Sequence, residues 1–244
     1  QKERILSTPG HYAYLKISEG CDRRCSYCAI PLIRGPFHSV PEDELLEEAR
    51  SLASSGVKEL IVVAQDISTY GVDLYGRNAL CRLLERLSAI DGIEWIRLHY
   101  AYPDGFPDDV LRLMADNPAI CKYIDIPLQH SADPVLKAMR RSVTGRETRG
   151  LIERMRATVP GVVLRTTLMV GHPGEGEAEF EDLMEFVSDY RFERLGVFKY
   201  CEEEGTWGAS HLSDSVPEEV KQERFDRIME LQSGISREYN LSRI

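Results

Sequence analysis

The sequence has no uninterrupted run of 18 apolar residues, so no segment is suited to cross a lipid bilayer as a helix. Its N-terminus, QKERILSTPG, also lacks the apolar core of a secretory signal peptide. With 43% hydrophobic and 29% charged residues, the composition is not that of a disordered, collagen-like or low-complexity chain. We therefore expect a cytoplasmic globular protein with no membrane partner.

Basic residues are in short supply. The chain has 30 Lys and Arg against 40 Asp and Glu, a net charge of −10. Nucleic-acid-binding proteins usually present a basic face, so nucleic acid is the less favoured partner and a basic protein suits the charge better. The charge is also uneven, because residues 1–40 hold six basic and three acidic side chains.

Strand-like and helix-like segments alternate along the 244 residues, a length that suits one or two domains. Apolar or alternating runs predict six strands, at 12–17, 57–64, 94–100, 122–128, 162–170 and 192–200. Amphipathic segments predict helices at 41–56, 79–90, 107–117, 133–141, 146–158, 175–190 and 217–240. We expect irregular loops at 18–39 and 201–215.

Repeated strand–helix units imply parallel strands joined by right-handed crossovers. Six units rather than eight predict an α/β fold of the incomplete (β/α)6 barrel type, a partial TIM barrel. In such barrels the functional site lies at the C-terminal ends of the strands. The loops that follow the strands are therefore where chemistry is expected.

Three of the six cysteines cluster directly after the first strand, at Cys21, Cys25 and Cys28. In a cytoplasmic chain they are not expected to form disulfides. Three thiolates can each hold one iron of a four-iron cluster and leave the fourth iron open for a small molecule. Zinc is the alternative, but it needs a fourth ligand, and the nearest candidate is His38. Of the other cysteines, we expect Cys81 and Cys121 to be small core residues, whereas the role of Cys201 is ambiguous.

The pattern Cys-x-x-x-Cys-x-aromatic-Cys after the first strand of a six-unit chain resembles the radical S-adenosylmethionine (SAM) superfamily. The stretch YLKISEGCDRRCSYCAIPLIRG at 14–35 resembles its methylthiotransferases, and the likeness continues at 62–76, 124–141, 166–175 and 198–206. YLKISEGC and QDISTYGVDLYG are similar to the branch that modifies an aspartate of small-subunit ribosomal protein S-twelve. The rival branch modifies adenosine beside the tRNA anticodon.

This resemblance implies a [4Fe-4S] cluster held by the three cysteines, with SAM bound at the open iron. The cluster would supply the electron that cleaves SAM to a 5′-deoxyadenosyl radical, which removes hydrogen from the β-carbon of the aspartate. A methylthio group is then added there, with its methyl from a second SAM. The implied partners are the basic S-twelve substrate and an electron donor such as flavodoxin or ferredoxin. The cofactors carry the difficult chemistry, and the protein binds and orients.

The resemblance also implies SAM contacts at the strand ends. We expect Tyr27 near the adenine, Gln65 and Asp66 near the amino group, and Gln129 and His130 near the ribose or the substrate. Each has a plain alternative: a surface tyrosine, a turn cap or a structural histidine.

Two later segments complete the expected SAM site. Arg165, whose side chain shares a strand face with Thr167, would neutralise the SAM carboxylate, with a buried salt bridge as the alternative. The turn GHPGE would contact the adenine or the SAM backbone through its glycines and its acid, Gly171, Gly174 and Glu175. His172 stands where the family often has an aromatic residue. Arg34 and Gly35 resemble an element that supports the cluster.

We divide the chain into a partial barrel at 5–215, with its iron–sulfur loop at 20–35, and a C-terminal helix at 216–244. By resemblance, an N-terminal domain with a second [4Fe-4S] cluster and a C-terminal substrate-binding β-domain are expected outside this chain. We therefore expect cluster and SAM binding but not sulfur insertion by this chain alone. A non-catalytic metal-binding module, or another radical reaction on the same barrel, is the further alternative.

Overall fold

A computed structural model describes residues 6–244, so the first residue of the expected 5–215 domain lies outside it. Its centre is a six-stranded sheet whose strands follow one another in chain order. The strands are β1 (Tyr12–Lys16), β4 (Glu59–Val63), β5 (Trp95–Leu98), β6 (Ile120–Asp125), β7 (Val163–Val170) and β8 (Arg194–Lys199). Every neighbouring pair is parallel. The expected incomplete (β/α)6 barrel is confirmed, with β1 and β8 at its two edges.

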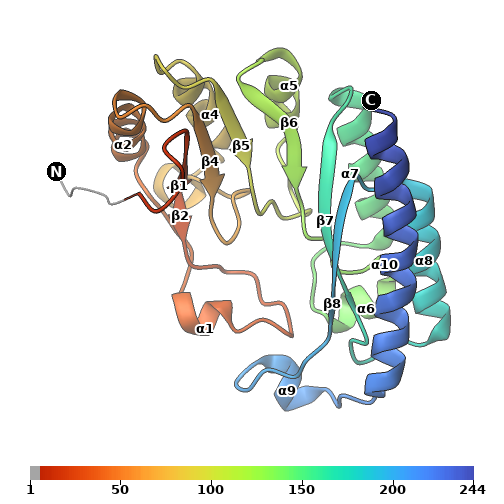
Figure 1. Cartoon of the computed structure of the whole chain (residues 1–244). Helices are drawn as coiled ribbons and strands as arrows, with labels where there is room; N and C mark the ends of the chain where they lie inside the picture. The colour runs from red at the N-terminus through yellow and green to blue at the C-terminus, as the bar shows by residue number, and fades with distance from the viewer. Residues whose placement is uncertain (1–5) are drawn as a thin grey trace.

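Helices cover the outer side of the curved sheet (Figure 1). The main ones are α2 (Glu42–Ser54), α4 (Leu80–Ser88), α5 (Asp108–Asp116), α7 (Gly145–Thr158), α8 (Glu177–Tyr190) and α10 (Glu218–Leu241), with a shorter α6 (Asp133–Ala138). Local sequence explains several starts. Acidic residues occupy the first turns of α2, α5 and α10, and Thr144 and Glu147 form a capping box at α7.

Strand alternation separates a core from an inner face. In β7, Leu164, Leu168 and Val170 are buried toward the helices, whereas Arg165 and Thr167 point to the opposite side. We call this opposite side the inner face. It includes large side chains that remain more than one third exposed, namely Tyr14, Trp95 and Phe198. The inner face is therefore open rather than packed.

Five short elements were not predicted. They are α1 (Ile30–Arg34), α3 (Val72–Tyr75), α9 (Trp207–His211) and the antiparallel pair β2 (Ser18–Glu19) and β3 (His38–Ser39). The expectation of wholly irregular loops at 18–39 and 201–215 is therefore wrong. A two-residue strand is too short to show an alternating pattern of apolar and polar residues. Hydrogen bonds to distant residues hold these strands, for example the bond that the Ser39 hydroxyl donates to Asp73 at 2.6 Å.

The β2–β3 pair closes the base of the cysteine loop. Gly20 follows β2 with φ at +76°, and a Cβ there would lie 2.0 Å from the carbonyl oxygen of Pro36. Only glycine fits both the close approach and the left-handed backbone. The two ends of the cysteine loop therefore lie close together at Gly20, and we call this point the pinched neck of the loop.

Some strands are shorter than the sequence predicts, because the backbone cannot continue the strand conformation. The strand expected at 122–128 ends at Asp125, because Pro127 cannot donate to a ladder and Gln129 has φ at +71°. At the other end of the chain, α10 packs against β8 and α8 and buries Ile228 and Ile235. Within residues 6–244, no helix has the length and apolar character needed to cross a membrane. The division at 215 stays a prediction.

Candidate functional site

A cavity of about 360 Å³ opens at the C-terminal ends of the strands. Its wall comes from the segments after β1, β4, β5 and β6, together with the segment after α6. The lining residues are Cys21, Arg23, Cys25, Tyr27, Cys28, Ile30, Ala64, Gln65, Asp66, Tyr100, Ala101, Tyr102, Pro127, Gln129 and Arg141. Seven residues that the sequence predicted as metal ligands or cofactor contacts are among them. These are Cys21, Cys25, Cys28, Tyr27, Gln65, Asp66 and Gln129.

The three cysteine thiols are free and line the same cavity. The loop is shaped by its backbone, because the N–H of Cys21 donates to Gly35 and that of Cys28 to Cys25. In the part of the chain that the structure describes, no three His, Cys, Asp or Glu side chains converge as ligands of one metal ion. A four-iron cluster can take one thiolate at each of three irons, and three thiols that line one cavity suit that arrangement.

Burial raises the pKa of two of the thiols, Cys21 and Cys28, and so favours their protonated forms. Burial raises the pKa of Cys21 to about 11, and the neighbouring Asp66 charge adds to the rise. Burial also raises the pKa of Cys28. Thiolate ligands must lose these protons when a metal binds, so cluster loading at this loop releases protons.

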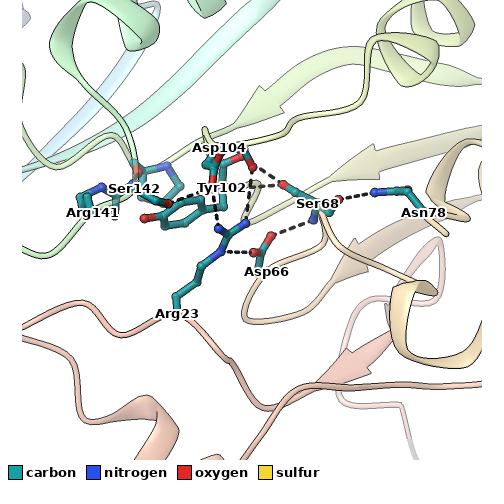
Figure 2. Close-up of polar contacts among 9 residues, drawn as sticks. Arg23, Asp66, Ser68, Asn78, Tyr102, Asp104, Arg141 and Ser142 are labelled. Atoms are coloured by element: carbon teal, nitrogen blue, oxygen red, sulfur yellow. Dashed lines mark hydrogen bonds and ion pairs between the residues drawn. The ribbon is translucent and has the colours of Figure 1, made fainter. Parts of the chain in front are cut away.

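Arg23 ties the cysteine loop to two other strand ends (Figure 2). Its Nε donates to Asp66 at 3.0 Å and its Nη1 to Asp104 at 3.0 Å. Asp66 also accepts from the backbone N–H of Ser68 at 2.8 Å, the capping role that was the plain alternative. Burial opposes the Arg23 charge, but Asp66 raises the pKa of Arg23 above its ordinary value. The Asp66 carboxylate, predicted to meet SAM, is thus already engaged by the protein.

Tyr102 lies between two guanidinium groups. The Arg23 carbon Cζ is 3.9 Å from its ring centre and that of Arg141 is 4.5 Å away. Arg141 also donates to the carbonyl of Pro127 at 2.8 Å and to the Tyr27 hydroxyl at 3.2 Å. Arg23, Tyr102 and Arg141 were missed as site residues, although Arg23 lies inside the cysteine motif and Arg141 ends a matched segment.

Gln65 and Gln129 line the cavity from the segments that follow β4 and β6. The Gln65 Oε1 atom is buried and has no hydrogen-bond partner within the described residues. Gln129 is fixed by two backbone bonds to β7, from its N–H to Thr167 and from Met169 to its carbonyl. Both Gln129 and Tyr100 hold φ above +60° without being glycine. Such strain persists where the surroundings enforce it, most often at functional sites.

His130 and Glu175 lie outside the cavity wall. The His130 ring is 3.1 Å from Glu175, which also accepts from the backbone of Gly171 at 2.9 Å and from Arg224 at 2.7 Å. All four groups are buried in one network that joins β6, β7 and α10. Gly171 and Gly174 have φ of +75° and +94°, the backbone freedom that the GHPGE turn requires. The predicted SAM contacts of these residues stay predictions.

Arg165 also lies outside the cavity wall, on the inner face. Its Nη1 is 3.1 Å from Oδ2 of Asp125, the salt bridge that was its alternative reading. Arg34 is exposed at the end of α1 and lies 3.8 Å from Glu19. The remaining cysteines match expectation only in part: Cys81 and Cys121 are half-buried, and Cys201 is exposed.

His172 anchors the cysteine loop from the far side of the barrel. Its ring stands edge-on to Tyr200, at 5.0 Å, and to Tyr27, at 6.3 Å. Nδ1 lies 2.9 Å from the carbonyl of Pro173, so Nδ1 carries the proton and Nε2 accepts from Ser26 at 3.3 Å. The histidine thus fills an aromatic place and adds a hydrogen bond.

Ser26 is bonded to three elements of the second half of the chain. Its N–H donates to Met139 at 2.9 Å, its hydroxyl to His172, and its carbonyl accepts from Gly208 of α9 at 2.7 Å. The side chain is fully buried. Figure 1 shows α1 and α9 at the same end of the sheet. The cysteine loop is therefore held by both edges of the open barrel.

The buried His172 predicts acid sensitivity of the fold. Burial lowers the pKa of His172 to about 4, below the 6.5 of a free histidine. The unfolded chain therefore gains a proton first as pH falls, and stability present above pH 6.5 is lost between pH 6.5 and 4. We expect a loss of about 2–3 kcal/mol from this residue by pH 4.5. Urea unfolding at pH 7.5 and 4.5 should show a shallower pH dependence for His172→Phe than for the wild type, whereas exposed His38→Phe should leave it unchanged.

The family model of the radical SAM superfamily matches residues 15–187, which include the cysteine loop and most of the sheet. The chain belongs to the radical SAM superfamily. This superfamily implies a [4Fe-4S] cluster and SAM, and the three thiols that line one cavity fit that assignment.

Several relatives are identical to this radical SAM chain at more than half of the aligned positions. Proteins named ribosomal protein uS12 methylthiotransferase RimO are 56% identical over 242 residues in Parabacteroides distasonis, and 57% identical in Bacteroides fragilis and in Flavobacterium johnsoniae. Each alignment covers 99% of this chain. The chain spans 56%, 56% and 55% of the lengths of these relatives.

Solved structures share the fold at low identity. Coproporphyrinogen III oxidase HemN from Escherichia coli has a TM-score of 0.65 at 17% identity, covering 91% of this chain and 52% of HemN. Methylornithine synthase PylB has a TM-score of 0.61 at 12% identity, covering 91% of this chain and 62% of PylB. These similarities support the fold alone.

Proposed function

We propose that this chain is the radical SAM core of a methylthiotransferase that modifies the β-carbon of an aspartate in ribosomal protein uS12. The observation that carries the proposal is the cavity that gathers Cys21, Cys25 and Cys28 beside Gln65 and Arg141. The substrate follows from the relatives named as uS12 methylthiotransferases, with 55–57% identity over the chain.

The residues of the cavity suit the two cofactors. Cys21, Cys25 and Cys28 would each ligate one iron and leave the fourth open. When bound, the cluster and SAM supply one-electron cleavage of a carbon–sulfur bond, which gives a radical able to break an unactivated C–H bond. The pinched neck at Gly20 and the bonds of Ser26 hold the thiols in place before any metal arrives.

Two cavity groups are suited to the polar end of SAM. The buried Gln65 Oε1 has no partner among the described residues and would accept from the SAM ammonium. The guanidinium of Arg141 lies in the wall, and its Nε is buried without a partner within residues 6–244, so it would donate to the SAM carboxylate. Tyr27, bonded to Arg141, would lie beside the adenine.

The paired groups around them act as supports. Asp66 orients Arg23, and Arg23 stacks on Tyr102, which in turn backs Arg141 (Figure 2). This chain of contacts fixes Arg141 without using its free Nε. The second [4Fe-4S] cluster and complete sulfur insertion would belong to parts of the enzyme beyond this chain, and a separate protein such as flavodoxin or ferredoxin would donate the electron.

Hydrogen removal tests the proposal without sulfur insertion. The chain is reconstituted anaerobically with iron and sulfide, reduced, and mixed with SAM and a uS12 peptide deuterated at the aspartate β-carbon. We expect about four irons per chain, an electron paramagnetic resonance spectrum that changes on adding SAM, and deuterium in the 5′-deoxyadenosine product by mass spectrometry. An undeuterated peptide is the control.

Each rival predicts a different label. Deuterium transfer from a tRNA anticodon stem-loop deuterated on its adenosine, with none from the peptide, would support the tRNA branch and overturn the uS12 assignment. Stoichiometric zinc, or a cluster whose spectrum ignores SAM, would support a metal-binding module instead.

A further inference from the structure

The inner face carries a buried carboxylate that the cavity does not explain. The Asp125 side chain is fully buried, and neither of its oxygens has a hydrogen-bond donor within the described chain. Desolvating a carboxylate without donors is unfavourable unless a cation lies beside it. Arg165, on the neighbouring strand and in register with Asp125, is that cation, at 3.1 Å.

Arg165 itself is only partly used. Its side chain is 43% exposed on the open inner face, and Asp125 is its one side-chain partner among residues 6–244. A guanidinium has five N–H donors in a planar fork that matches a carboxylate in two-point contact. No other ion pair or side-chain hydrogen bond of Arg165 occurs among residues 6–244, so its remaining donors are available to a ligand.

The surroundings favour an anion at this point. Arg97 is paired with Glu59 at 2.6 Å and Arg165 with Asp125. Arg194 has no carboxylate partner in the described residues and donates instead to the Glu193 carbonyl and to Asn240 of α10. Arg97, Arg165 and Arg194 all lie close enough to Tyr123 to act on its phenol, although burial leaves its pKa raised. Three arginines thus act on one point of the inner face, in a chain whose net charge is −10.

The position of this pair relates it to the cavity. Asp125 lies two residues before Pro127, which lines the cavity. The backbone carbonyl of Asp125 accepts a hydrogen bond from the N–H of Ala101, which lines the same cavity. Arg165 therefore lies one layer deeper in the barrel than the cysteines. In the proposed SAM site the carboxylate would meet Arg141 of the wall, and Arg165 would then be left without a cofactor group to bind.

We propose that Arg165, held by the buried Asp125, binds the side-chain carboxylate of the substrate aspartate. This inference rests on the proposed function and deepens it. The β-carbon that would react is one bond from that carboxylate carbon, so a two-point grip on the carboxylate orients the β-carbon hydrogens. Arg165 then sets the specificity for aspartate, and Asp125 is a positioning residue that aims the fork.

Binding of two peptides tests the role. The chain is reconstituted and saturated with SAM, and the dissociation constants of a uS12 peptide with the target aspartate and of the same peptide with asparagine are measured at fixed salt. We expect the wild type to prefer aspartate by about tenfold or more, the range of a charge-assisted contact. Arg165→Gln should bind both peptides equally, and Arg165→Lys should keep only part of the preference.

Two further variants guard against misfolding and general charge effects. Arg165→Gln leaves Asp125 unpaired in the interior, so the double change Asp125→Asn with Arg165→Gln removes both charges and should lose the preference in a folded chain. Arg154→Gln removes a comparable arginine, paired with Asp108 at 2.9 Å on the outer α7, and should keep it.

The outcomes separate this inference from the proposed function. A wild type that prefers aspartate and an Arg165→Gln variant that prefers it equally would overturn the role of Arg165 alone. A loss of SAM affinity in Arg165→Gln, with the peptide preference intact, would overturn it in favour of a SAM contact. A wild type that binds neither peptide while still cleaving SAM would overturn the substrate assignment, and the carboxylate role with it.

Discussion

Cys25→Ala is expected to abolish both iron retention and SAM cleavage. Cys25 is the middle thiol of the three that line the cavity, and a four-iron cluster held by three thiolates has no protein ligand to spare. The backbone around it is fixed by the bonds of Ser26, so no other cysteine can move into its place. After anaerobic reconstitution, iron per chain should fall from about four to near zero, and no 5′-deoxyadenosine should form.

Cys201→Ala is the matched control for this experiment. Cys201 is exposed, follows β8, and does not line the cavity. Iron content and SAM cleavage should equal those of the wild type. Full iron content in Cys25→Ala would contradict the ligand assignment, as would loss of iron in Cys201→Ala.

Arg141→Lys is expected to weaken SAM binding by roughly 10- to 100-fold while the cluster is retained. Lysine keeps the positive charge but not the fork that reaches the Pro127 carbonyl and the Tyr27 hydroxyl together. It also loses the stacking on Tyr102. Equilibrium titration of the reconstituted chain with SAM, followed by electron paramagnetic resonance, measures the change.

The neighbouring residue provides the control. Arg140 is exposed, lies over Trp207 at 4.8 Å, and does not line the cavity. Arg140→Lys should leave the SAM affinity within about twofold of the wild type, as expected for a surface change. Equal affinities in Arg141→Lys and the wild type would remove Arg141 from the proposed SAM site.

The barrel could be predicted because its signals are local and repeated. Buried strands such as β4 are visible as apolar runs, and helices such as α2 begin at a proline followed by acidic residues. The cysteine loop, Gln65 and Gln129 could be placed because strand ends of a parallel barrel meet at one edge. These are properties of a segment or of the strand order, and both are visible in sequence.

The support residues were missed because their roles depend on distant partners. Arg23 meets Asp104 across 81 positions and Arg141 meets Tyr27 across 114, and neither pairing leaves a local pattern. Conversely, His130 and Glu175 follow strand ends but turn into a buried network with Arg224 of α10. Position at a strand end predicts proximity to the site, not the direction of the side chain.

The attachments of Ser26 have a mechanical consequence. The edge strands β1 and β8 belong to opposite ends of the sheet, yet the loop after β1 is bonded through Ser26 to α9, which follows β8. Any ligand that stiffens this loop therefore also resists the spreading of the two edges. By thermodynamic linkage, the width of the barrel's open seam and the occupancy of the thiols are coupled. Binding of the metal and entry of a bulky substrate would then depend on the same equilibrium between a narrower and a wider opening of the barrel.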